Sequence, residues 1–315
     1  MGAYIVRRLL QMVPVVVLVT IFVFLMLHLG SDPIVLLSGG GEALDQQQIA
    51  ALRAQYSLDR PLPIQYFIWM GKVFRGDLGT SIVTQQPVGY ELKGRLPVTL
   101  ELGLFAWLFS IIIAIPAGVL SATRRGSLAD TTATILTIGG LAIPGFWLAI
   151  MLIFLFAVHW RLLSPFGFVS VFHDPVEGIK SQILPIVSLG LGAAALNMRQ
   201  MRSAMLEVLA QDYIRTARAK GLKERKVIWQ HAFRNSVLPV VTIMGLQIGR
   251  IAGGAVVVEN IFAISGVGRL LVQSILSRDF PVVQAIVLII STMVLISNLL
   301  TDLVYAYIDP RIRYT

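Results

Sequence analysis

Residues 9–30 read LLQMVPVVVLVTIFVFLMLHLG, a run that contains no Asp, Glu, Lys or Arg. An α-helix needs about 20 mostly apolar residues to cross the hydrocarbon core of a bilayer, and this run is long enough. Arg7 and Arg8 precede it, as in a secretory signal, but the run continues past the usual length of a signal's apolar region without a small-residue cleavage site. We therefore expect a retained transmembrane helix here.

The remainder of the chain has the same character. Of the 315 residues, 56% are apolar and only 14% are charged, against about 25% charged in soluble domains, and the mean hydropathy is +0.77. Five further apolar stretches follow, at residues 102–123, 131–158, 181–198, 236–258 and 280–301. The sequence predicts an all-α integral membrane protein with six transmembrane helices in a single domain, residues 1–315.

The positions of the basic residues predict the orientation of these helices, because short cytoplasmic loops carry an excess of Lys and Arg. Arg7 and Arg8 precede the first span, Arg124 and Arg125 follow the second, and the connection 199–235 holds nine basic residues against three acidic ones. All of them fall on one side if there are six crossings. We therefore expect cytoplasmic N- and C-termini, a cytoplasmic loop at 199–235 and an exported loop at 31–95. The net charge of +9 is interpreted against the lipid bilayer, and no nucleic-acid partner is expected.

The exported loop is expected to contain helices. Asp45 is suited to cap one helix, and Pro63 is suited to open a second segment that runs through the aromatic stretch 66–74. Such aromatic residues suit the membrane interface or the exported ends of the spans, and the sequence leaves both open.

Several kinds of chemistry have no support in the sequence. The absence of cysteine excludes thiolate nucleophiles and Cys-ligated metals, and the absence of a GxxxxGK[ST] loop indicates that the chain binds no ATP itself. There is no HExxH motif, and the histidines are dispersed at positions 28, 159, 173 and 231, so no metal site and no enzyme activity are expected. An intramembrane protease and an ion-coupled secondary transporter are the alternatives from other classes.

The span 236–258 contains two features of its own. Arg250 is the one charge well inside an apolar stretch, and it is suited either to line a translocation pathway or to a structural role. Gly245, Gly249 and Gly253 recur at a spacing of four, which lets another helix approach closely. That second helix belongs either to this chain or to another subunit.

The connection between the fourth and fifth spans carries the strongest signal. Residues 206–241 read LEVLAQDYIRTARAKGLKERKVIWQHAFRNSVLPVV. We expect Asp212 to cap a short helix that Gly221 ends in the left-handed conformation, and a second helix over residues 223–234. So short a helix is marginal in water and needs a partner surface, which Ala217 and Ala219 would let come close.

In this segment, YIRTARAKG at 213–221 and HAFRNSVLPVVT at 231–242 resemble the cytoplasmic coupling loop of ABC importer permeases. The resemblance is to the B-type subunit of the dipeptide/oligopeptide/nickel transport family. It extends along the chain through YIVRRLLQMVP at 4–14, GDLGTSI at 76–82, RLPVTLEL at 95–102 and the long stretch 256–285. One departure is that Arg215 stands where the general signature has Glu, so the role of that Glu is not carried over.

The resemblance implies the type I ABC importer permease fold, with the chain as a non-catalytic half of a translocation pathway in the bacterial inner membrane. It implies as partners a second related permease, two cytoplasmic ATPase subunits that use ATP and Mg, and an exported solute-binding protein. The implied cargo is a dipeptide or oligopeptide, glutathione included, with nickel or sugars as the alternatives. The residues implied in ATPase coupling are Asp212, Tyr213, Ile214, Arg215, Thr216, Ala217, Lys220 and Gly221.

Overall fold

The computed structural model describes residues 2–30 and 59–308, and those residues are almost entirely helical. An isolated antiparallel bridge joins Thr80 and Pro87. The helices, of which η1 and η2 are π-helical, are α1 (Gly2–Gly30), α4 (Leu62–Phe74), α5 (Val88–Thr123), α6 (Leu128–Ala142), α7 (Gly145–Leu152), η1 (Ile153–His159), α8 (Pro175–Leu209), α9 (Asp212–Ala219), α10 (Glu224–Lys226), η2 (Val227–Phe233), α11 (Arg234–Ile261), α12 (Val267–Leu276) and α13 (Phe280–Ile308).

The chain divides into two compact units. The first contains Met1–Pro97 and Gly266–Leu295, and the second contains Val98–Ser265 and Ile296–Thr315. The boundary falls within α5 and within α13, so these two helices contribute residues to both units.

In the first unit, α4 packs on α1. The hydroxyl groups of Thr20 and Tyr66 lie 2.9 Å apart, and Phe24 meets the Tyr66 ring edge-on. Pro63 lies in the first turn of α4, which confirms the expected helix start. The helix predicted after Asp45 lies outside the described residues.

The rest of the first unit is built around an apolar core and a buried carboxylate. The core joins the first turns of α5 to α12 and α13 through Val88, Leu92, Val267, Leu270, Val282, Ala285 and Ile286. Asp279, which is 3% exposed, accepts hydrogen bonds from the Ser81 hydroxyl and from the backbone N–H of Ile82. These bonds attach the loop before α5 to the turn between α12 and α13.

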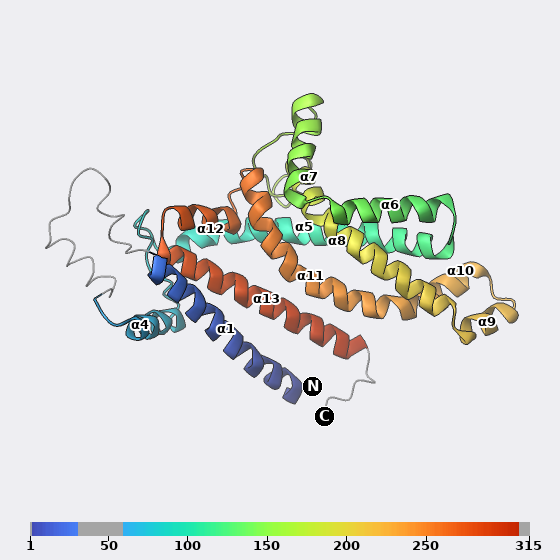
Figure 1. The fold of residues 1–315 in the computed structure, drawn as a ribbon, viewed down its shortest axis with the longest axis horizontal. Coiled ribbons are helices and arrows are strands. Elements are labelled where there is room, and N and C mark those ends of the chain that lie inside the picture. Colours follow the sequence, from blue (N-terminus) through green and yellow to red (C-terminus); the bar gives the residue numbers. More distant parts are fainter. Residues whose placement is uncertain (1, 31–58, 309–315) are drawn as a thin grey trace. The chain divides into compact units, whose positions relative to one another are not determined.

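In the second unit, α6, α8 and α11 run side by side, with α8 in contact with both of the others (Figure 1). Two apolar clusters form its core. One joins α5, α7, α8 and α11 through Leu102, Ala149, Leu184, Val258, Phe262 and Ile264. The other, which we call the coupling core, surrounds α9 and contains Val119, Ala122, Met201, Met205, Ile214, Ala217, Val227, Ala232, Val240 and Met244.

Four described helices are long and apolar enough to cross a membrane, namely α1, α5, α8 and α13. Two further spans are obtained if each of two bent helix pairs is counted as one span, which gives six. The predicted span 131–158 is one of them, because α6 and α7–η1 meet at 104°. Pro144 explains the break, since it has no N–H to donate and keeps Ile143 extended, with φ −78° and ψ 121°. The other pair, Glu224–Gly249 with Ile251–Ile261, is bent by 47°.

Candidate coupling helix and its polar support

The predicted short helix of the 199–235 connection is α9, over Asp212–Ala219. Asp212 is its first residue rather than its cap, since Gln211 precedes the helix and makes no capping hydrogen bond through its side chain. Gly221 has φ +75°, which confirms the predicted left-handed end. An L-residue rarely takes this conformation, so glycine lets the chain turn back at this point.

One face of α9 packs inside the chain. Ile214 is fully buried and Ala217 is 7% exposed, and both belong to the coupling core with Met201 and Met205 of α8. This corrects our expectation for Ala217, because its small side chain lets α9 approach the chain's own core and leaves it unavailable to a partner. Ala219 is exposed, as expected for a contact residue.

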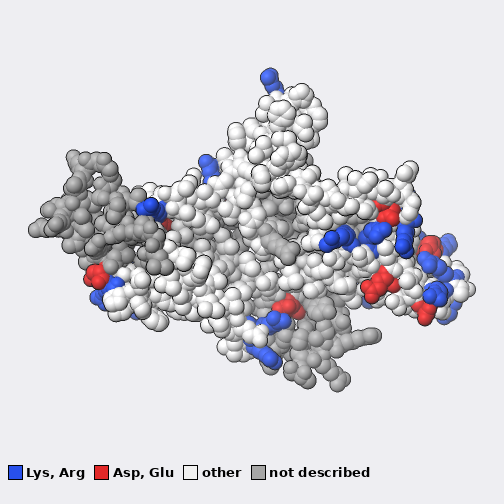
Figure 2. Space-filling view, in the orientation of Figure 1, with Lys and Arg blue, Asp and Glu red and all other residues white. Residues whose placement is uncertain are grey.

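The opposite face of α9 is open and polar. Among the predicted coupling residues of α9 and of the turn that follows it, the exposed ones are Asp212, Tyr213, Arg215, Thr216, Lys220 and Gly221. In the second unit, Lys, Arg, Asp and Glu gather around the end that carries α9 and α10 (Figure 2). Six of the eight predicted coupling residues therefore share one surface, and Ile214 and Ala217 anchor that surface from below.

Polar contacts attach α9 to the segment that follows it. Asn235 donates to the Tyr213 hydroxyl at 2.9 Å, and Arg218 donates to Glu224 at 2.7 Å. The hydrogen bond to Glu224 raises the pKa of the Arg218 guanidinium above its ordinary value. These bonds connect the two ends of the turn around Gly221.

The second helix predicted for this segment, at 223–234, does not end at Arg234. Helix α10, the π-helical η2 and α11 follow one another without a break, and Pro239 lies inside α11. In the same way α8 continues to Leu209, well beyond the predicted span end at 198. The connection therefore consists mainly of extensions of the two long helices, and α9 lies in the chain between these extensions.

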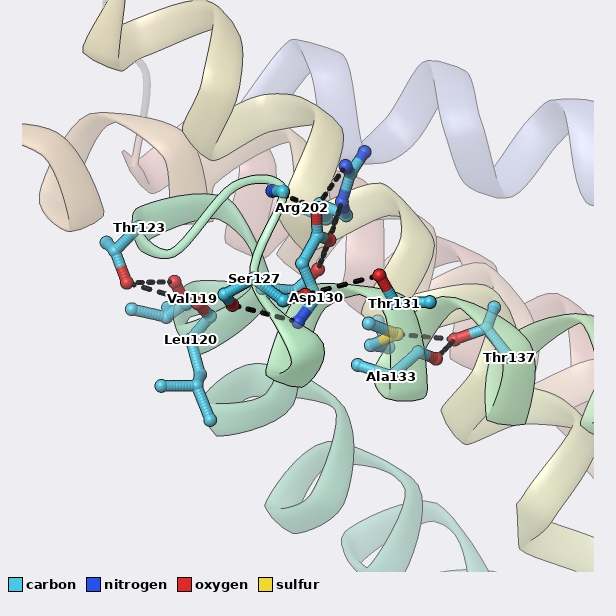
Figure 3. A network of polar contacts seen from close by, with 12 residues as sticks. Val119, Leu120, Thr123, Ser127, Asp130, Thr131, Ala133, Thr137 and Arg202 are labelled. Atoms are coloured by element: carbon cyan, nitrogen blue, oxygen red, sulfur yellow. Dashed lines mark hydrogen bonds and ion pairs between the residues drawn. The ribbon is translucent and has the colours of Figure 1, made fainter.

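A buried polar network supports these extensions (Figure 3). Arg202 of α8 donates to Asp130 of α6 through Nε at 2.8 Å and through Nη2 at 3.1 Å. The Ser121 hydroxyl of α5 also donates to Asp130, and the Gly126 N–H donates to it at 3.0 Å. Three helices and one turn thus converge on one carboxylate. Sequence reasoning counted Arg202 only as a loop charge and missed its partner, which is 72 residues away.

The glycines of α11 differ in their surroundings. A Cβ atom at Gly245 would overlap the side chain of Thr301 in α13, whereas a Cβ at Gly253 would meet nothing within 4 Å. At Gly254, which the sequence analysis did not single out, a Cβ would lie 2.9 Å from Leu189. The surroundings of Gly249 and the side chain of Arg250 lie outside the described part of the structure.

A cleft of about 490 Å³ opens in the second unit between α6, α7, α8 and α11. The described residues of its lining are mostly apolar or glycine, and the polar ones among them are Ser188 and Gln247. Among the described residues, no group of three or more His, Cys, Asp or Glu is placed to hold a metal ion.

Comparison with known proteins identifies the family to which this chain is similar. Residues 114–314 match the family described as "Binding-protein-dependent transport system inner membrane component", and residues 1–103 match the N-terminal part of such components. The dipeptide transport system permease protein DppB of Escherichia coli K12 is 40% identical over 334 residues, which cover 99% of this chain and 98% of that protein. A putative peptide transport system permease protein of Brucella abortus is 41% identical over the full length of both chains.

The solved structures agree with the fold. A chain of the MetNI methionine ABC transporter, in an inward-facing conformation, has a TM-score of 0.58 and 18% identity, over 70% of this chain and 97% of that one. The expected all-α, type I ABC importer permease fold is thereby confirmed. The protein belongs to the family of binding-protein-dependent transport system inner membrane components, and it is a multi-pass permease of the inner membrane.

Proposed function

We propose that this chain is the transmembrane permease subunit of an ATP-driven importer of peptides. The names of relatives that match over nearly their whole length, which print dipeptide or peptide transport, support the peptide class. Oligopeptides and glutathione are included in the proposed class on the resemblance of the sequence alone. Nickel complexes and sugars are the alternative cargoes. The observation that carries the coupling role is the two-sided character of α9, which is held to the coupling core on one face and open and charged on the other.

The proposed complex contains a second, related permease that completes the translocation pathway as a heterodimer. It also contains two cytoplasmic ATPase subunits and an exported solute-binding protein. In this assembly ATP and Mg are used by the ATPase subunits, and this chain binds no cofactor. The proposal requires both termini and α9 to be cytoplasmic.

The chain's part in transport would be mechanical. Closure of the ATPase pair on ATP would press on the exposed face of α9. Ile214 and Ala217 belong to the coupling core, which also contains Met201 and Met205 of α8 and Val240 and Met244 of α11. A close-packed core transmits a displacement instead of absorbing it. The two long helices would therefore move with α9, which favours one of two states of the pathway. Arg250 remains our sequence-based candidate for a pathway residue.

The experiment purifies the tagged chain from the membrane with its partners and identifies them by mass spectrometry. The ATPase activity of the complex is then measured with and without peptide-loaded binding protein. The variant Arg215→Glu reverses a charge on the exposed face of α9 and is expected to remove most of the stimulation while the complex stays assembled. Lys72→Glu, an exposed basic residue of α4 in the first unit, is the matched control and should keep full stimulation. A chain that purifies without an ATPase, or equal stimulation in both variants, would refute the coupling role.

A further inference from the structure

The cleft of the second unit has a volume of about 490 Å³, which is in the range of small-molecule sites, about 300–1,000 Å³. Its lining offers a solute little polar contact, because most of it is apolar side chains and glycine backbone, as at Leu141, Phe146, Gly192 and Ile251. The Ser188 hydroxyl already donates to the Pro185 carbonyl of its own helix at 2.9 Å. The Ser188 oxygen still has acceptor capacity, and Gln247 of α11 differs from it in having a buried side-chain atom with no partner among the described residues.

The side chain of Gln247 is held by a chain of hydrogen bonds across three helices. Its Nε2 donates to Oδ1 of Asn197 in α8 at 2.8 Å, and Asn197 Nδ2 donates to the hydroxyl of Ser110 in α5. Ser110 in turn donates to the Trp107 carbonyl at 2.7 Å. Gln247 is 3% exposed, and Asn197 and Ser110 are fully buried.

This chain determines which way each amide points. The Ser110 hydroxyl has one proton, which it gives to Trp107, so it can only accept from Asn197. The amide nitrogen of Asn197 therefore faces Ser110, and its oxygen faces Gln247. Gln247 must then present its own nitrogen to Asn197, and its carbonyl oxygen Oε1 is directed elsewhere. That oxygen is buried and has no hydrogen-bond partner in the described part of the chain.

A buried acceptor without a donor lowers stability, and such atoms are rare in native proteins unless a bound group satisfies them. The unsatisfied atom here is an acceptor, on a residue that lines a solute-sized cleft. An N–H group suits this acceptor, and an apolar surrounding favours a neutral N–H over an ammonium, whose charge would remain uncompensated.

We propose that Gln247 is a recognition residue of this cleft, and that its Oε1 accepts a hydrogen bond from a peptide N–H of the solute during passage. This inference rests on the proposed function. A hydrogen bond to the peptide unit, amid the mostly apolar side chains of the described lining, recognises peptides irrespective of side chain. It is also weak enough for the solute to leave.

The test uses the complete complex with its binding protein in proteoliposomes supplied with ATP. Uptake of a dipeptide is compared with uptake of the same dipeptide methylated on its peptide nitrogen, for the natural chain and for Gln247→Met. For each chain, uptake of the unmethylated dipeptide is divided by uptake of the methylated one. Both chains receive cargo from the same binding protein, so the preference of the binding protein cancels when these two ratios are compared. One lost hydrogen bond predicts that Gln247→Met reduces the preference for the unmethylated peptide by about fivefold. The Leu141→Met control, at an apolar residue of the same lining, should leave the preference unchanged.

Equal loss of uptake for both peptides in Gln247→Met would show that the residue is merely structural and would overturn the inference. If Gln247→Met does not assemble, Gln247→Glu, which in its protonated form donates to Asn197 and keeps a carbonyl acceptor, must retain the preference, and its loss there would refute the inference. Absence of ATP-dependent uptake by the natural complex would instead contradict the proposed function.

Discussion

Arg202 of α8 and Asp130 of α6 form a bidentate ion pair that is largely enclosed, with side-chain exposures of 29% and 8%. The pair lies beside the coupling core, since the neighbouring residue Met201 and Met205 of the same helix belong to that core together with Ile214 and Ala217 of α9. It joins α6 to the end of α8 that supports α9. The position of the coupling helix therefore depends on a charge pair outside the coupling motif itself.

Asp130→Asn keeps the shape of the side chain and removes its charge, which leaves the Arg202 guanidinium without a counter-charge. We expect a loss of about 2 kcal/mol, somewhat below the cost of breaking a fully buried pair because Arg202 is partly exposed. The measurement is the thermal unfolding midpoint of the purified complex in detergent. Lys180→Gln, which breaks an ion pair whose side chains are 56% and 57% exposed, should cost about 0.5 kcal/mol or less. Similar shifts for the two variants would contradict this reading.

Ala217→Asp and Ala219→Asp separate the two faces of α9. Ala217 is buried in the coupling core, so a carboxylate there is expected to prevent accumulation of the folded chain. Ala219 is exposed, so the same substitution should leave assembly intact and reduce stimulation of the ATPase by loaded binding protein. Size-exclusion chromatography measures assembly, and phosphate release measures stimulation. Normal assembly of Ala217→Asp would show that α9 is not anchored as described.

Gly221→Leu tests the turn after α9. The backbone there has φ +75°, and a Cβ atom would meet nothing within 4 Å, so the cost comes from the backbone conformation alone. We expect about 1–2 kcal/mol for Leu and a smaller cost for Asn, which tolerates this conformation better. The thermal unfolding midpoint should be highest for the natural chain with Gly221, lower for Gly221→Asn and lowest for Gly221→Leu. Equal midpoints for the Asn and Leu variants would mean that the turn is not left-handed.

Gly245→Ala and Gly253→Ala lie on the same helix but should have opposite effects. A Cβ at Gly245 overlaps Thr301, so overpacking is expected to cost about 1–3 kcal/mol. Gly253 has open space around its Cβ position, and alanine there should stabilise α11 by up to about 1 kcal/mol through helix propensity. Thermal unfolding of the two variants, side by side in the assembled complex, decides the matter. Destabilisation by Gly253→Ala would indicate that another subunit packs on that face.

Particular residues show which structural features the local sequence predicted correctly and which it did not. Pro63 marked the start of α4, and Gly221 marked the end of α9, because proline and glycine restrict or free their own backbone whatever lies around them. Pro144 was equally visible, yet the 104° bend that it permits depends on how α7 packs against α8 and α11. The cap at Asp212 was misplaced by one residue, as helix ends often are.

Hydropathy by itself determined that this is a helical membrane protein, because a bilayer accepts only long apolar segments whose backbone groups are bonded within the helix. The resemblance of residues 213–221 and 231–242 to a coupling loop also marked 206–241 as the candidate coupling segment. Only the tertiary structure decided which face of α9 is buried, which carboxylate Arg202 meets and which way the Gln247 amide points. Those outcomes depend on contacts between residues as far apart as Asn197 and Ser110, and a linear pattern contains no information about distances across helices.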